Sequence, residues 1–548
     1  MKRILKFFKR MRENYVDTLG NLYEYSTTVY SDNKLSQVID GELSYTYGSF
    51  KKRCDSISKK LSQYGIGSCD KVAILANNTP NWTVAFFACV PFSRIVVPIL
   101  TESSENEVTN ILIHSESKAI FISRKLLHKL SPESLSSLRL VVDIDTFETI
   151  RADDDAFTCD GRVAVPMPED IAAIIYTSGT TGSAKGVVLS HRNFTSNIIS
   201  RYHSHKCTER DTWLSILPMA HTYELTLGVL YPIYCGATVY YLSTPPVPAL
   251  LLAAMKKVRP TVLLTVPLII EKIYRNSVLP TIRKSKTLSW MNERYNKLMC
   301  LIIGMKLKKS LGGRITFFGV GGAKLDTTVE EFLWKARFPY AIGYGLTETS
   351  PLLGHAVGKH RYPGSIGFPV YGIEMRLDNV NPETGEGEIV VRGDNVMLGY
   401  YKDPKRTKEA FTEDGWFKTK DVALMDNKGR YYIRGRIGNM IVGPSGENIY
   451  PEEIESVIND IEGVNESIIV ERKGRLVALI QFNENIIDWD SEGEAEFYEK
   501  LEARKATILN IVNKKVSKIS KINDVEVMKE PFDKTATRKI RRFKYKEE

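Results

Sequence analysis

The chain has 548 residues, of which 43% are hydrophobic and 26% are charged, and its formal net charge is +10. This length is too great for one hydrophobic core, so roughly two to four domains are expected, with the composition of an ordinary globular protein. Seven cysteines are scattered without a C-x-x-C pair, which favours free thiols in a reducing cytosol and argues against a disulfide framework or a zinc site.

The first twelve residues, MKRILKFFKRMR, carry six basic residues and no acidic residue. No long apolar segment or small-residue cleavage site follows, which argues against a signal peptide. Two interpretations of residues 1–12 stay open: a short amphipathic helix on an anionic membrane surface, or a solvated terminus. We therefore expect a cytoplasmic protein, peripheral on the inner membrane surface under the first interpretation, with no nucleic-acid partner. The sequence does not fix the oligomeric state.

The longest apolar stretch runs from Val84 to Leu100 and contains Arg94 and two prolines. It is shorter than the ~20 residues that a membrane span needs, so we expect a buried helix followed by a buried strand. From about residue 43 to residue 390, helical patterns alternate with short apolar runs. This alternation predicts an α/β fold with parallel sheets covered on both faces. The runs are KVAILA, RIVVPIL, KAIFIS, LRLVVDI, IAAIIYT, TWLSILP, ATVYYL, TVLLTVP and RITFFGV.

The pattern changes near residue 430, where a strand, a glycine-rich turn and a helix that opens with Pro451, Glu452 and Glu453 are expected. Proline and acidic residues suit the first turn of a helix. The last hundred or so residues therefore predict a small α+β unit. We place the boundary between Arg434 and Gly438, which gives domains 1–434 and 435–548.

The segment YTSGTTGSAKGVVLSH, residues 176–191, follows one of the predicted strands. Its glycines let backbone amides approach a ligand, its hydroxyls can donate to oxyanions, and Lys185 adds a positive charge, so a polyphosphate is the expected ligand. The spacing is not that of a Walker A loop, because Lys185 follows Ala184 where that motif has glycine. The segment resembles the phosphate loop of the adenylate-forming superfamily, which includes acyl-CoA synthetases, peptide-synthetase adenylation domains and luciferases. The resemblance assigns ATP binding to Thr177, Ser178, Gly179, Thr180, Thr181, Gly182 and Lys185.

Two further segments follow in the order found in that superfamily. GGAKL is similar to the family's adenine-side loop and contributes Gly321, Gly322 and Ala323. GYGLTETSP contributes Gly343, Tyr344 and Gly345 to the nucleotide site, with the Tyr344 ring able to stack on a purine. In the same segment the resemblance gives Thr347 a phosphate contact and Glu348 the role of ligand to Mg²⁺, a hard cation that prefers oxygen ligands.

The C-terminal part of the chain supplies the remaining family positions. The resemblance places Asp421 and Arg436 on the ribose hydroxyls, and Gly438 at an interdomain hinge where the family usually has Asp or Lys. The segment PFDKTATRKIRR resembles the family's closing motif and puts Lys539 on the catalytic lysine, with Arg538 replacing the customary glycine. Gly446 would help to form a tunnel for the pantetheine of CoA.

The resemblance implies a large N-terminal adenylate-forming domain, with two stacked α/β subdomains and a β-rich subdomain, and a small mobile α+β C-terminal domain. The segments LPMAHTYELTLGVL and TVPLIIEKIY are similar to long-chain fatty acyl-CoA synthetases. They place His221 at the acyl pocket, and Leu268 where members commonly have arginine. The implied reaction converts a medium- to long-chain fatty acid, ATP and CoA into acyl-CoA, AMP and pyrophosphate. Two alternatives stay open: a ligase that loads an acyl or aryl acid onto a carrier-protein pantetheine, and a non-catalytic nucleotide- or lipid-binding homologue.

Overall fold

The computed structural model describes residues 16–153, 162–178, 184–242, 248–443, 447–483, 486–487, 489, 495–535 and 539–546. The predictions made for residues 1–12, Gly179, Thr180, Thr181, Gly182, Gly446 and Arg538 therefore lie outside the described residues. Contacts between residues divide the chain into two compact units. Unit 1 holds the chain up to Thr177, Ala184–Met375 and Val391–Phe417, and unit 2 holds Arg376–Val390 and the chain from Lys418 onward. The predicted boundary between Arg434 and Gly438 falls inside unit 2 and stays a prediction.

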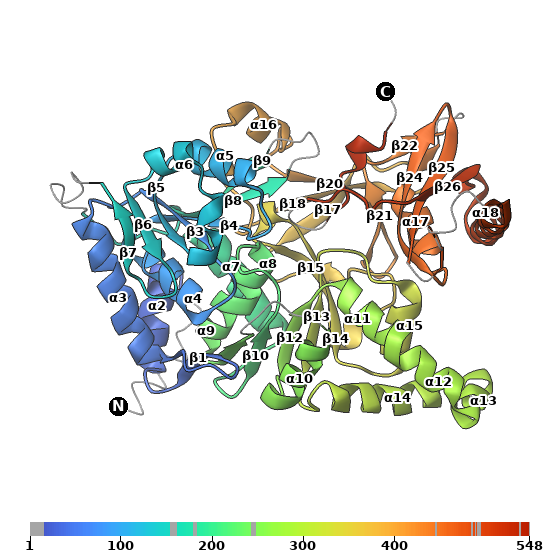
Figure 1. Cartoon of the computed structure of the whole chain (residues 1–548), viewed down its shortest axis with the longest axis horizontal. Coiled ribbons are helices and arrows are strands. Elements are labelled where there is room, and N and C mark those ends of the chain that lie inside the picture. The colour runs from blue at the N-terminus through green and yellow to red at the C-terminus, as the bar shows by residue number, and fades with distance from the viewer. Residues whose placement is uncertain are drawn as a thin grey trace. The chain divides into compact units, whose positions relative to one another are not determined.

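One sheet of unit 1 has eight strands within the described residues, and its central strands are parallel (Figure 1). Helical segments connect β3 to β4, β4 to β5 and β5 to β6, as expected for parallel pairing. In spatial order the strands are β19 (Gly399–Tyr400), β9 (Ala184–Ser190), β8 (Ile171–Ser178), β4 (Ile95–Ile99), β3 (Lys71–Leu75), β5 (Ser117–Ile122), β6 (Leu140–Asp143) and β7 (Thr149–Ala152).

A second sheet of unit 1 has nine strands within the described part of the chain. Strands β10 to β14 and β1 pair in parallel, whereas β15, β16 and β2 pair antiparallel at the two edges. In order they are β16 (Phe368–Pro369), β15 (Leu352–Ala356), β14 (Tyr340–Gly345), β13 (Phe317–Val320), β12 (Val262–Thr265), β10 (Thr212–Ser215), β11 (Thr238–Tyr241), β1 (Lys34–Val38) and β2 (Ser44–Thr46).

Helices of unit 1 cover both sheets, and α4 contacts β3 of one sheet and β1 of the other. Helix α4 thus lies against strands of both sheets. The helices are α2 (Leu19–Val29), α3 (Tyr47–Gln63), α4 (Pro80–Phe87), α5 (Glu105–Ser115), α6 (Pro132–Ser137), α7 (His191–Ser204), α8 (Thr222–Glu224), α9 (Tyr231–Cys235), α10 (Pro248–Val258), α11 (Pro267–Ile273), α12 (Leu279–Lys284), α13 (Lys286–Arg294), α14 (Asn296–Ser310), α15 (Thr327–Lys335) and α16 (Pro404–Glu409). Two π-helical segments, η4 (Leu225–Leu230) and η5 (Tyr274–Val278), continue α8 and α11.

The parallel α/β fold predicted from the sequence is confirmed, because each of the nine apolar runs forms a strand of these two sheets. The stretch from Val84 to Leu100 contains the end of α4 and the buried strand β4, as predicted. Its one charged residue, Arg94, is fully buried. The guanidinium donates hydrogen bonds to Ile66 O, Ala88 O and both oxygens of Ser58, and to Ser62 Oγ, so its donors are satisfied inside the core.

Unit 2 contains a four-stranded sheet and an α+β part. The four-stranded sheet has the order β17 (Glu374–Asp378), β18 (Gly387–Arg392), β20 (Phe417–Met425) and β21 (Tyr431–Arg436). The α+β part contains β22 (Ile441–Val442), β23 (Asn448–Ile449), α17 (Pro451–Asn459), β24 (Val464–Arg472), β25 (Arg475–Phe482), α18 (Ala495–Lys515) and β26 (Asp524–Met528). Pro451 begins α17 with Glu452 and Glu453 in its first turn, as predicted.

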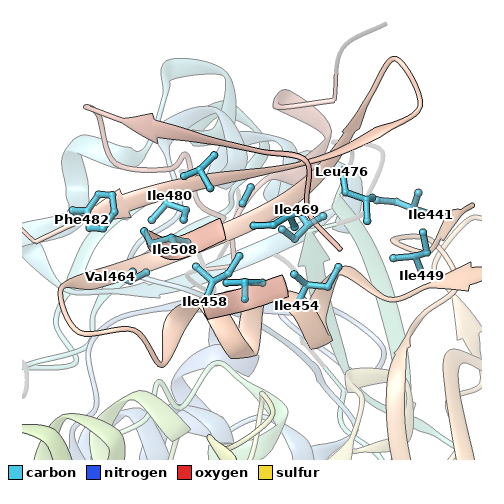
Figure 2. Close-up of a cluster of buried hydrophobic side chains, with 14 of the residues drawn as sticks. Ile441, Ile449, Ile454, Ile458, Val464, Ile469, Leu476, Ile480, Phe482 and Ile508 are labelled. Carbon is cyan, nitrogen blue, oxygen red and sulfur yellow. The ribbon is translucent and has the colours of Figure 1, made fainter. Parts of the chain in front are cut away.

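The core of the α+β part is built from aliphatic side chains of α17, β24 and β25 (Figure 2). Ile454 and Ile458 lie four residues apart on one face of α17 and are fully buried against Ile469 and Ile480. This cluster gives unit 2 a core of its own, as the sequence predicts for an α+β unit.

The six cysteines that the structure describes carry free thiols, as expected. None of the helices described in this chain has the length and apolar character that crossing a membrane requires.

Candidate active site

The predicted phosphate loop begins at the end of a buried central strand. Strand β8 buries Ala172, Ala173, Ile174 and Ile175 and ends at Ser178. The hydroxyl of Thr177 is buried and has no hydrogen-bond partner among the described residues. A buried hydroxyl normally finds a partner, so this one fits a ligand oxygen. The side chain of Ser178 lies outside what the structure describes.

Lys185 and Glu348, which are 163 residues apart in the chain, form an ion pair in unit 1. Lys185 lies on β9, and its Nζ is 2.7 Å from Glu348 Oε1. Burial by itself would raise the pKa of Glu348, but the charge and hydrogen bond of Lys185 outweigh it, so the pKa is lowered from its ordinary value. Glu348 is therefore an anion at neutral pH.

Tyr400 completes this cluster and was not predicted from the sequence. Its hydroxyl lies 3.0 Å from Glu348 Oε1 and 2.9 Å from Lys185 Nζ, and its ring centroid is 4.5 Å from that nitrogen. Strand β19 places it there by pairing with β9, with Tyr400 opposite Val187. No local pattern around Tyr400 could have identified it, because its partners are 52 and 215 residues away in the chain.

The glycine segments GGA and GYG lie side by side because β13 and β14 are adjacent parallel strands. A Cβ on Gly321 would lie 3.5 Å from Gly343 O and 3.2 Å from the Tyr223 ring. A Cβ on Gly345 would lie 1.7 Å from Pro351 O, so only glycine fits there. Gly322 has a φ of +87°, which favours glycine, and it is exposed with Ala323.

The remaining predicted site residues of unit 1 lie near the end of a strand or the beginning of a helical segment. Tyr344 is half-buried at the end of β14, and Thr347 begins η6 (Thr347–Thr349), one residue before Glu348. His221 precedes α8, where its Nδ1 accepts a hydrogen bond of 3.3 Å from the backbone N–H of Tyr223. Leu268, at the start of α11, is 49% exposed. The structure thus brings the loops of both sheets together at the carboxyl ends of their strands, where α/β folds bind ligands.

Unit 2 carries the other predicted residues. Asp421 on β20 and Arg436 on β21 are cross-strand neighbours, with Arg436 Nε 3.4 Å from Asp421 Oδ1. Gly438 is exposed two residues after β21, and no atom lies within 4 Å of the position that its Cβ would take. The backbone there is therefore unobstructed by neighbouring side chains.

Lys539 is exposed next to residues that are fixed to the rest of unit 2. The N–H of Lys539 donates to Thr535 Oγ1 at 3.2 Å, and its carbonyl accepts from Thr535 N at 2.8 Å. Earlier in the chain, Phe532 is buried against Ile468 and Leu479. Later in the chain, both terminal nitrogens of Arg542 donate to the buried carboxylate of Glu455. The described backbone before and after Lys539 is thus anchored.

The described side chains do not form a complete metal site by themselves, since they include no cluster of three or more His, Cys, Asp or Glu suited to a metal ion. Mg²⁺ is commonly bound by one or two carboxylates together with substrate phosphates. The ionised Glu348 and the unpartnered hydroxyl of Thr177 fit such a phosphate-bound cation.

Comparison with known proteins agrees with this geometry. The model of the family described as "AMP-binding enzyme" matches residues 27–401. The chain is 30% identical over 525 residues to long chain acyl-CoA synthetase 6, peroxisomal, of Arabidopsis thaliana, covering 86% of this chain and 74% of that protein. It is 27% identical over 620 residues to the long-chain-fatty-acid–[acyl-carrier-protein] ligase AEE15, chloroplastic, of the same plant, covering 93% and 82%. The fold is similar to O-succinylbenzoate coenzyme A synthetase of Bacillus subtilis in complex with ATP and magnesium ion, with a TM-score of 0.75, 21% identity, and coverage of 95% and 98%.

The ion pair predicts how Glu348 contributes to the reaction. In Glu348→Gln the anion that would hold Mg²⁺ is lost, and we expect ATP-dependent pyrophosphate release to slow by roughly two to three orders of magnitude. The Mg²⁺ concentration at half-maximal rate should rise. Tyr400→Phe is the control, because it keeps the ring beside Lys185 and removes one hydrogen bond; its rate should stay within about tenfold of the parent. An unchanged Mg²⁺ dependence in Glu348→Gln would show that this carboxylate does not hold the metal.

Proposed function

Because the chain belongs to the AMP-binding enzyme family and is an ATP-dependent, AMP-forming acid–CoA ligase, we propose that its substrate is a medium- to long-chain fatty acid. The observation that carries the proposal is the 30% identity to a long chain acyl-CoA synthetase over 86% of this chain. An apolar cavity of about 30 Å³ beside the GYG segment, lined by Gly343, Leu227, Leu264 and Leu352, lies on the face that the acyl chain would occupy. Each methylene that the protein buries would contribute about 0.8 kcal/mol.

The first half-reaction joins the acid to the nucleotide. The fatty acid is already ionised at neutral pH, so no general base is needed for its attack on the α-phosphate of ATP. Catalysis then consists mainly of positioning the reactants and stabilising charge on the phosphoryl oxygens. Thr177, Lys185 and Thr347 would bind phosphate oxygens, and Glu348 would hold Mg²⁺, whose charge favours departure of pyrophosphate. Lys539 would bridge the carboxylate and the α-phosphate.

The remaining site residues would bind the adenosine of ATP and would then bring the acyl group and the thiol of CoA together to form the thioester. Tyr344 would stack on the purine, and Asp421 would accept hydrogen bonds from the ribose hydroxyls beside Arg436. The acyl-AMP must then become open to the thiol of CoA, and rotation at Gly438 would achieve this exchange. Gly446 would line the path of the pantetheine.

A second candidate acceptor is a carrier-protein pantetheine. The similarity to the plant acyl-carrier-protein ligase supports this alternative, because that protein covers nearly the whole chain. The acid site would be the same in both cases, and only the thiol donor would differ. Comparing CoA with a carrier protein as acceptor, with the same acid in both assays, therefore distinguishes an acid–CoA ligase from a carrier-protein ligase.

A panel of acids from acetate to stearate tests the proposed substrate. We expect pyrophosphate release to be fastest with acids of octanoate length or longer, because affinity grows with the number of methylenes that the protein buries. Thioester formation should be measured with CoA and with a phosphopantetheinylated carrier protein in parallel. No release with any acid from octanoate to stearate would rule out a fatty acid as substrate, and a rate higher with the carrier protein would favour the second candidate.

Lys539→Ala tests the role of the C-terminal lysine. We expect adenylation, followed as pyrophosphate release, to fall by at least about a thousandfold, because the charge that would join carboxylate and phosphate is lost. ATP binding and thioester formation from a supplied acyl-adenylate should change far less. Lys534→Ala is the matched control, since Lys534 directly precedes Thr535 in the chain and pairs with Glu466 at 2.7 Å. Full adenylation by Lys539→Ala would show that this lysine has no part in the first step.

A further inference from the structure

The small apolar cavity beside the GYG segment is lined by two polar side chains that the proposed reaction does not use. Its volume is about 30 Å³, and Arg201 and His355 line it among mostly apolar neighbours. A cavity of this size holds about two water molecules or one small polar group. Arg201 comes from the last turn of α7 and His355 from β15.

Arg201 is a buried cation without an anionic partner. The residue is 3% exposed, and its guanidinium stacks 3.9 Å from the centroid of the Phe317 ring. Nη1 donates to His205 O at 3.1 Å, but Nη2 is buried and has no hydrogen-bond partner in the part of the chain that the structure describes. Among the described residues no carboxylate forms an ion pair with Arg201. A buried charge in this state is costly, so the arrangement favours a ligand that supplies the missing acceptor.

His355 presents a second unsatisfied atom to the same cavity. Its Nδ1 is buried and has no hydrogen-bond partner among the described residues. Burial and the neighbouring Arg201 lower the pKa of His355 to about 4, so the ring is neutral at neutral pH and can serve as donor or acceptor. The two unsatisfied nitrogens therefore suit an oxygen that accepts from Arg201 and also meets the imidazole.

The position of Arg201 along the sheet indicates which end of the acid it would meet. Phe317, under the guanidinium, begins β13, whereas Gly321 of the adenine-side segment follows the end of that strand. Four residues of strand separate them by roughly 13 Å. An acid whose reacting carboxylate lies near the glycine segments would therefore reach Arg201 only with its far end.

We propose that Arg201 and His355 form a subsite for an oxygen at the distal end of the substrate, so that the preferred acid is a fatty acid with a terminal carboxylate or hydroxyl group. Arg201 binds this oxygen through Nη2 and fixes the length of acid that fits. The proposal rests on the proposed acid–CoA ligase function and narrows its substrate class.

The test compares matched acids of equal length, from hexanoate to hexadecanoate: the plain acid, the ω-hydroxy acid and the α,ω-dicarboxylic acid. At its best length the parent enzyme should show a kcat/KM roughly tenfold or more higher for an ω-oxygenated acid than for the plain acid. Arg201→Met should abolish this preference while keeping or raising the rate with the plain acid. Arg192→Met on the same helix is the control, since Arg192 is partly exposed and pairs with Glu169, and it should leave the preference unchanged.

Each outcome decides between the possibilities. A parent enzyme that prefers plain acids at every length overturns the subsite, and a water bridge between Arg201 and His355 would then account for both nitrogens. Equal losses for all three acids in a folded Arg201→Met also overturn it. Arg201→Lys, which keeps the charge, provides the second variant if Arg201→Met does not fold, and should retain part of the preference. Failure of every acid to release pyrophosphate would instead contradict the proposed function.

A separate surface of unit 1 carries an unusual concentration of positive charge. The segment 279–310, which forms α12, α13 and α14 and is called the helical projection below, contains a single acidic residue, Glu293. Figure 1 shows α12 and α13 at the end of α14 that lies away from the strands. The eight basic residues of the helical projection are Arg283, Lys284, Lys286, Arg294, Lys297, Lys306, Lys308 and Lys309.

Large apolar side chains are exposed on the same helical projection. Trp290 is 51% exposed and Tyr295 is 55% exposed, and their ring centroids are 5.5 Å apart. Leu298 and Met305 on α14 are 51% and 66% exposed and lie seven residues apart, on one face of the helix. Lys297 and Lys306 are the immediate sequence neighbours of these two residues, so exposed apolar and basic side chains alternate on α14.

We propose that the helical projection binds an anionic lipid surface. Trp and Tyr are favoured at the boundary between headgroups and acyl chains, and exposed Leu and Met can insert there. The basic residues supply attraction to acidic headgroups. An acidic protein would suit the charge but not the exposed Trp290–Tyr295 pair together with the apolar face of α14, so a membrane is the better match.

Vesicle co-sedimentation of the full chain tests this second proposal. Binding is expected to vesicles that contain phosphatidylglycerol and to be much weaker with phosphatidylcholine alone. Lys297, Lys306 and Lys309 changed together to Gln should lower the partition coefficient roughly a hundredfold, since each lysine near an anionic surface contributes about fivefold. Trp290→Ser should weaken binding without changing its salt dependence.

The matched control changes Lys52, Lys59 and Lys405, which are exposed elsewhere in unit 1, to Gln and should bind as the parent does. A further variant neutralises the basic residues of segment 1–12 instead. Binding that is lost only in this variant, or lost equally in the lysine control, overturns the role of the helical projection. Vesicle-independent capture of an acidic carrier protein by the projection would also overturn it in favour of a protein partner.

Discussion

The ion pair between Lys185 and Glu348 is the interaction on which the site in unit 1 depends. Lys185 belongs to the eight-stranded sheet, whereas Glu348 follows β14 of the nine-stranded sheet. Tyr400 bonds to both, so the carboxyl ends of strands from two sheets are held at one point. The pair also keeps a buried carboxylate ionised, which burial alone would oppose. One interaction thus joins the two sheets and keeps Glu348 ionised.

Much of this arrangement could be predicted because it follows from local patterns. The nine apolar runs predict strands by their length and flanking turns, and glycine is required at Gly345 because the backbone of Pro351 leaves no space for a side chain. Tyr400 and Arg201 could not be predicted in this way. Each acts through partners that are distant in sequence, and neither stands in a pattern that distinguishes it from a tyrosine or arginine of the core.

The buried polar groups of unit 1 separate into two kinds. Arg94 is as deeply buried as any residue of the core, yet backbone carbonyls and serine oxygens accept its hydrogen bonds. Arg201 and the hydroxyl of Thr177 are also buried, but each keeps an atom without a partner. Folded proteins rarely leave such atoms unsatisfied, so under the two proposals above a ligand would complete the hydrogen bonding of these two groups. Thr177 would meet the nucleotide, and Arg201 the far end of the acid.

Unit 2 presents the exposed Lys539 on backbone that is held in place before and after it. Lys539 is exposed, so its ammonium has little desolvation cost before a reactant arrives. The position of Lys539 must then be set by its backbone. That backbone is held by the pairing with Thr535, the burial of Phe532 and the Arg542–Glu455 pair. Glu455 itself is buried, and its pKa is raised by burial despite Arg542. Loss of Arg542 would therefore leave the buried carboxyl group of Glu455 without its cationic partner, although the Ile469 N–H still donates to it, and would alter the position of Lys539 without removing it.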